Sequence, residues 1–130
     1  MKKRGPQILV VVADNQNWEY LRSKLIMNGY HVDQLRRVAI PTELQDVLAM
    51  SGTSHTHIVM DLEYAATARI EFIDAVLAYR EKISLERRPW VIVACNLITD
   101  LGDLIFQEKF RQLSWKPART LLDRILDEIK

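Results

Sequence analysis

Three short runs of apolar residues, each nearly uninterrupted and rich in β-branched side chains, constrain the fold of this chain most strongly. They read ILVVVA at residues 8–13, HIVMD at 57–61 and WVIVAC at 90–95. A strand with one face in water alternates apolar and polar residues, whereas a strand buried on both faces shows a continuous run. Two weaker segments, YHVDQLR at 30–36 and RQLSW at 111–115, complete the set. The pattern predicts a five-stranded parallel sheet with helices on both faces.

Helical periodicity fills the intervals between these strands. The predicted helices cover residues 17–28, 41–50, 67–83, 99–110 and 118–130. Gly29 is placed to stop the first helix, Thr42 and Gln45 have the spacing of a capping box, and Ile83 falls off the apolar stripe, so the third helix is expected to end before it. That stripe contains Ile70, Ile73, Val76 and Leu77. Strand–helix alternation repeated five times predicts a doubly wound α/β sheet.

Composition limits the class of protein. A chain of 130 residues suits one domain, 1–130, with residues 1–6 as a loose tail. The net charge of +1 gives no overall field that would select nucleic acid or a membrane. The apolar run after the basic start is too short for a signal peptide, and no segment has the length of a membrane span. We therefore expect a cytoplasmic protein that binds neither nucleic acid nor membrane.

Charged residues follow the predicted strands where chemistry is expected in such a sheet. Ligands bind beyond the carboxyl ends of the strands, and Asp14, Asp61 and Lys116 stand at those ends of the first, third and fifth strands. Two acids and a lysine that meet at one edge suit a divalent cation and a phosphoryl group, with Asp61 as the nucleophile.

The chain resembles the receiver domains of response regulators from Ile8 to Ile129. HIVMDLEY resembles the phospho-acceptor strand with Asp61 in the acceptor position, PWVIVACN resembles the fourth strand, and LSWKP resembles the fifth, with Lys116 as the usual lysine. The resemblance implies a flavodoxin-like (βα)5 fold with strand order 2-1-3-4-5. It also implies a histidine kinase or phosphotransfer protein as phosphoryl donor, and a weak Mg²⁺ site at Asp14, Asp61 and Glu63.

Several positions depart from the receiver pattern. The two adjacent acids after the first strand fall either at Val12 and Ala13 or at Ala13 and Asp14, so at least one acid is missing. The Ser or Thr that ends the fourth strand is replaced by Ala94, and the aromatic residue before the lysine is replaced by Leu113. Because a ligand shifts two states only through differential contacts, these replacements predict that the usual phosphorylation switch does not operate.

The function predicted from these features is that of a receiver-like signalling module, not an enzyme. It would act mainly through protein–protein interaction in a two-component pathway. The partner surface implied by the family is formed by 99–110, 111–115 and 118–130, with Ile105, Leu113 and Trp115 as contacts for a downstream protein or a second copy of the chain. The alternatives are an active receiver phosphorylated on Asp61 with Mg²⁺, and a small flavodoxin-like cofactor protein.

Some residues keep two interpretations. Asp14 either binds a cation or begins the first helix, with Asn15 or Asn17 as the cap. The spacing of His55 and His57 allows a metal site, but no third ligand is evident. The basic stretches at 35–37 and 86–89 are expected to be solvated surfaces.

Overall fold

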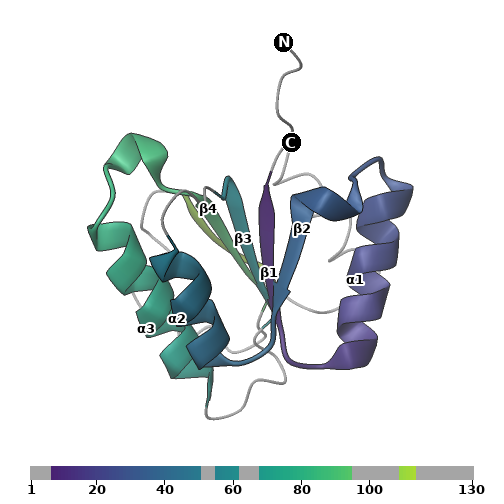
Figure 1. Ribbon diagram of the computed structural model, residues 1–130, viewed down its shortest axis with the longest axis horizontal. Coiled ribbons are helices and arrows are strands. Elements are labelled where there is room, and N and C mark those ends of the chain that lie inside the picture. The colour runs from purple at the N-terminus through teal and green to yellow at the C-terminus, as the bar shows by residue number, and fades with distance from the viewer. Residues whose placement is uncertain (1–6, 51–54, 62–67, 95–108, 114–130) are drawn as a thin grey trace.

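A computed structural model describes residues 7–50, 55–61, 68–94 and 109–113 of the chain. The strands are β1 (Ile8–Val12), β2 (Leu35–Val38), β3 (His57–Asp61), β4 (Trp90–Ala94) and β5 (Phe110–Leu113). The helices are α1 (Asn15–Met27), α2 (Pro41–Ala49) and α3 (Ala68–Glu81), with short 3₁₀ turns at Val32–Gln34 and Leu85–Arg87. Figure 1 shows α1 on one side of the sheet and α2 with α3 on the other.

The five strands form one parallel sheet in the order β2-β1-β3-β4-β5. This confirms the doubly wound α/β fold and the strand order implied by the resemblance. β1 and β3, which lie at the centre, are buried along their whole length. Burial on both faces is the physical reason why their sequences are continuous apolar runs.

Each face of the sheet has its own apolar core, because successive strand residues point to opposite sides. Leu9 and Val11 of β1 face α2 and α3, and this core also contains Val38, Leu44, Val47, Ile58, Met60, Phe72, Ile73, Val76, Val91 and Val93. Ile8, Val10 and Val12 face α1, where they pack with Leu21, Leu25, Val59 and Ile92. By the same alternation, Asp61 and Arg37 lie on the α1 face of the sheet.

Both ends of α1 have well-defined caps. Asp14 is the N-cap, and its Oδ1 accepts a 2.8 Å hydrogen bond from the Asn17 backbone N–H. At the other end Gly29 has a φ of 99°, the Gly29 N–H donates to the Ile26 carbonyl, and the Tyr30 N–H donates to the Leu25 carbonyl. This is the Schellman arrangement that a glycine permits, so the predicted stop at Gly29 is confirmed.

Three predictions about β2, α2 and α3 were wrong. The second strand runs over Leu35–Val38 and not over 30–36, because residues 32–34 form a 3₁₀ turn first. The start of α2 has no capping box from Thr42; its N-cap is Ile40, and the Glu43 carboxylate accepts from the Ala39 N–H at 3.0 Å.

The third wrong prediction concerns the apolar stripe of α3. Ile70 is 67% exposed, while Phe72, which was not assigned to the stripe, is 1% exposed and fills the core. The helix does end before Ile83, at Glu81, as expected. Residues 99–108 of the predicted helix 99–110 lie outside the described residues, but Phe110 is the first residue of β5, so the helix does not extend to residue 110 as predicted. The predicted helix 118–130 also lies outside the described residues, as do Ser114 and Trp115 of the predicted fifth strand.

Basic side chains attach the beginning of β5 to α3 and to the turn before β4. Arg80 is buried, and its Nη1 donates to the Lys109 carbonyl at 3.4 Å. Lys109 Nζ donates to the carbonyls of Glu86 and Arg88. Burial, and then the neighbouring Arg88, lower the pKa of Arg80. The stretch 86–89 is therefore partly structural and not only a solvated surface.

Within the ranges that the structure describes, no helix is long and apolar enough to cross a membrane.

Candidate functional site

The carboxyl edge of the sheet brings together the residues that the sequence singled out. Backbone register aligns Val12 with Asp61, Asp61 with Ala94, and Ala94 with Leu113. The predicted acceptor position and the two altered switch positions therefore lie in one row across β3, β4 and β5. Such a row follows from parallel pairing, because strands that start in register also end at a common edge.

Asp61 is the buried carboxylate of this row. Only 4% of the residue is exposed, and its Oδ2 accepts a 3.1 Å hydrogen bond from Nδ2 of Asn17 in the first turn of α1. A buried charge is tolerated when hydrogen bonds compensate for its lost hydration. Asn17 is thus a site residue that sequence reasoning named only as a possible helix cap.

Asn17 links the two acids that the sequence placed at this edge. Its backbone N–H donates to Asp14 and its side-chain amide donates to Asp61. Asp14 is exposed and serves as the N-cap itself, so the assignment of the cap to Asn15 or Asn17 was wrong. The alternative role of Asp14, binding a cation, stays a prediction.

Arg37 of β2 reaches over the carboxyl end of β1. Its Nε donates to the Val12 carbonyl at 3.2 Å, and its Nη2 donates to the Ala13 carbonyl at 3.3 Å and to Oδ1 of Asn15 at 2.7 Å. The guanidinium carbon lies 5.8 Å from the centroid of the Trp18 ring, within the range of a cation–π contact. The prediction that residues 35–37 form a solvated surface was therefore wrong for Arg37.

The sequence contained a signal for Arg37, but the misplaced strand concealed it. The strand extends two residues further than predicted, which puts Arg37 opposite Val10 in the middle of β1, and its side chain reaches the Val12 carbonyl at the strand's carboxyl end. The predicted strand ended at residue 36, so Arg37 fell outside it and was assigned to a solvated surface. Asn17 had no comparable signal, because its contact with Asp61 depends on how α1 packs on the sheet.

Other predicted site residues lie outside the described part of the chain. Lys116 and Glu63 belong to this group, as do the predicted partner contacts Ile105 and Trp115. Leu113 is described as the last residue of β5, which fixes its backbone position.

The described donors fit a divalent cation poorly. Mg²⁺ prefers carboxylate oxygens in a near-octahedral set, but Asp14 Oδ1 caps a helix and the carbonyls of Val12 and Ala13 accept from Arg37. Across the described ranges no group of three or more His, Cys, Asp or Glu side chains is arranged to hold a metal ion.

The two histidines lie toward the opposite edge of the sheet. His57 is the buried first residue of β3, and its Nδ1 is 2.8 Å from Oγ1 of Thr56. Burial lowers the pKa of His57; the pKa of His55 is lowered by burial and then by the charge of Arg36. In both cases the lowered pKa favours the neutral imidazole.

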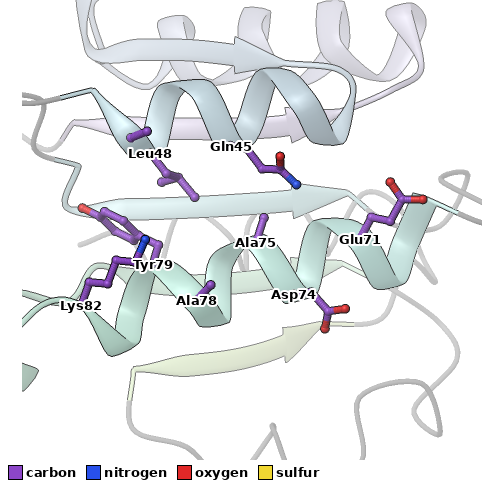
Figure 2. Close-up of a pocket in the computed structure, with 9 residues that line it drawn as sticks. Gln45, Leu48, Glu71, Asp74, Ala75, Ala78, Tyr79 and Lys82 are labelled. Carbon is purple, nitrogen blue, oxygen red and sulfur yellow. The ribbon is translucent and has the colours of Figure 1, made fainter.

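A separate groove of about 740 Å³ runs between α2 and α3. Figure 2 shows Glu71 toward the end of the groove where the strand arrows point, and Tyr79 and Lys82 at the other end. The lining residues are Gln45, Leu48, Ala49, Glu71, Asp74, Ala75, Ala78, Tyr79 and Lys82. No predicted site residue is among them, so the groove is distinct from the carboxyl-edge site.

Strand order, the two-sided core and a buried aspartate at the end of the central strand define the receiver type of doubly wound α/β fold. The chain is similar to the solved structure of a response regulator receiver domain (CheY-like) from Methylobacillus flagellatus, with a TM-score of 0.68 and 23% identity over 98% of this chain and 100% of that one. It is also similar to the bacteriophytochrome response regulator AtBRR, with a TM-score of 0.65 and 14% identity over 98% of this chain and 94% of that one.

These similarities confirm the receiver fold that the sequence resemblance implied. No protein-family model matches the chain, and no curated protein matches it either. At identities of 23% and 14% the similarity establishes the fold alone.

Proposed function

We propose that this protein is a receiver-like signalling module of a two-component pathway, and that it acts mainly through protein–protein contacts without the usual phosphorylation switch. The observation that carries the proposal is the row at the carboxyl edge. Asp61 is the proposed phospho-acceptor, and the strand register aligns it with Ala94 and Ala94 with Leu113. Neither replacement has the hydroxyl or the aromatic ring that relays phosphorylation in the receiver pattern.

The loss of the relay has a direct physical consequence. A phosphoryl group on Asp61 would need a hydroxyl at position 94 that donates a hydrogen bond to one of its oxygens, so that the following loop is pulled inward. Alanine offers no hydrogen-bonding group, so phosphorylated and unphosphorylated states would have nearly equal contacts there. Without a difference in contact energy, the equilibrium between two conformations does not move.

The signalling role is proposed to depend on a surface and not on catalysis. The partners would be a histidine kinase or phosphotransfer protein on one side and a downstream protein on the other, in the cytoplasm. The contact surface would include Leu113 at the end of β5 together with Ile105 and Trp115, and a second copy of the chain is the alternative occupant. Alanine variants of these three residues, tested by sedimentation for self-association and by co-purification with partners, examine that surface.

An NMR experiment tests the missing switch. The ¹⁵N-labelled protein is treated with acetyl phosphate and Mg²⁺, and intact mass determines whether one phosphoryl group is added. We expect that amide shift changes, if Asp61 is modified, stay near Asp61 and do not extend along β5. The variant Ala94→Thr with Leu113→Tyr restores both relay groups and is expected to extend the changes to β5.

Two outcomes would contradict the proposal. One is a set of large shift changes across β5 in the phosphorylated wild-type protein that disappears in Asp61→Ala. The other is a partner interaction that requires Asp61 phosphorylation. Either result would favour the second candidate function, an active receiver, which is supported by the buried position of Asp61 at the end of the central strand.

A further inference from the structure

Arg37 occupies the region where a receiver of the usual pattern would place the acids that hold a metal ion. The loop after β1 begins at Ala13, and its carbonyl oxygen and that of Val12 both accept from the guanidinium. Both are backbone oxygens at the carboxyl edge of the sheet. A cation that entered here would have to compete with an arginine that is already bound.

The Arg37 guanidinium makes four contacts, so it is not a freely moving surface charge. Three hydrogen bonds, of 2.7, 3.2 and 3.3 Å, fix its plane against the loop and Asn15. Trp18 lies 5.8 Å away as the fourth contact. Arginine suits such a position because its planar fork binds several acceptors at once and loses its proton only at very high pH.

Two acids among the described residues at this edge bind the first turn of α1. Asp14 caps the helix through the Asn17 backbone, and Asp61 accepts from the Asn17 side chain. Asp61 lies one strand away from Val12, at a strand spacing of about 4.8 Å. Arg37 binds the Val12 carbonyl on the strand beside Asp61, and Arg37 and Asp61 lie on the same face of the sheet, so the guanidinium charge is at the same edge and face as the Asp61 carboxylate.

We propose that Arg37 makes this edge of the sheet independent of metal. Its guanidinium takes the loop oxygens and supplies the positive charge that a divalent cation would otherwise bring, and it thereby excludes Mg²⁺ from Asp61. This inference rests on the proposed function and adds to it. The receiver-like site would retain its aspartate but would not recruit the metal ion used for phosphoryl transfer.

The test is a Mg²⁺ titration followed by ¹⁵N NMR, with the Asn17 side-chain amide and the Arg37 Nε–H as probes. Four proteins are compared: wild type, Ala13→Asp, Arg37→Met, and the double variant. Methionine keeps an unbranched apolar stem beside Trp18 while removing the charge, and Ala13→Asp restores an acid to the loop. Dispersed amide spectra show that each variant is folded.

We expect no saturable shift for wild type or Ala13→Asp up to about 20 mM Mg²⁺, and saturation of the double variant at least about tenfold below that concentration. The matched control combines Ala13→Asp with Arg36→Met. Arg36 is the neighbouring arginine of β2, but its side chain is exposed and its Nη2 contacts Met50 Sδ at 3.8 Å. This control removes the same charge from the opposite face of the sheet and is expected to leave Mg²⁺ excluded.

Saturable Mg²⁺ shifts in wild type, with displacement of the Arg37 Nε–H signal, would overturn the proposal. Equal Mg²⁺ binding by the Arg36 control and the Arg37 double variant would also overturn it. So would a folded Arg37 double variant whose NMR signals do not shift with Mg²⁺. None of these results depends on partner binding or on phosphorylation, so they are distinct from a failure of the proposed signalling function.

Discussion

The hydrogen bond between Asn17 and Asp61 allows a quantitative prediction about the candidate site. Asn17→Ala removes the Nδ2 donor, while the backbone N–H that binds Asp14 stays in place. A hydrogen bond to a charged, buried acceptor contributes about 1.5–3 kcal/mol, and Asp61 is only 4% exposed. Alanine has a higher helix propensity than asparagine, which offsets up to about 0.7 kcal/mol of this loss. We therefore expect a net loss of about 1–2 kcal/mol in the free energy of unfolding.

Urea unfolding followed by circular dichroism measures this loss directly. The matched control is Gln16→Ala in the same turn of α1; Gln16 is exposed and is expected to change stability by less than about 0.5 kcal/mol. A double-mutant cycle with Asp61→Ala separates the pair from other effects, because each residue has further neighbours. We expect a coupling energy of at least about 1 kcal/mol between positions 17 and 61.

A coupling energy below about 0.3 kcal/mol, the usual error of additivity, would refute this reasoning. It would mean that the Asn17 amide does not stabilise the Asp61 carboxylate, and that the edge of the sheet is organised by other contacts. A stability loss equal to that of Gln16→Ala would lead to the same conclusion.

Three further predictions concern the framework around the site. Asp14→Ala should cost about 1 kcal/mol by removing the N-cap of α1, whereas Asp14→Ser should cost much less, as measured by urea midpoints. Leu44→Ala should cost about 2–5 kcal/mol because Leu44 is fully buried, and the partly buried Leu48 should cost less when it is replaced in the same way. Stability should fall as the pH drops below about 6.5, because burial holds the pKa of His57 below its ordinary value and the unfolded chain then binds more protons than the folded one. His57→Gln should make that fall less steep in thermal melts, and an unchanged slope would argue against the assignment.

The general architecture was predictable because it depends on patterns that do not require tertiary context. The continuous runs at 8–13, 57–61 and 90–95 predicted strands buried on both faces, and β1, β3 and β4 lie within those bounds. Gly29 predicted the end of α1, because only a residue without a side chain adopts a φ near 99° at little cost. Alternation of strands and helices then left few topologies to consider.

Boundaries and faces were less predictable where local signals were weak. The segment before β2 has β-branched and aromatic residues, yet residues 32–34 form a 3₁₀ turn, so the strand begins at Leu35. Ile70 fits a helical stripe by spacing, but α3 is rotated so that Phe72 enters the core instead. Packing against the sheet decides such rotations, and a single sequence does not show it.

For this protein the order of residues determined which segments are strands, which are helices, and which acids stand at the strand ends, because backbone propensity and apolar periodicity act over short distances. Tertiary structure alone decided that Asn17 binds Asp61 and that Arg37 covers the end of β1. These contacts join residues 44 and 25 positions apart, and they exist because parallel pairing and the packing of α1 bring distant side chains to the same edge.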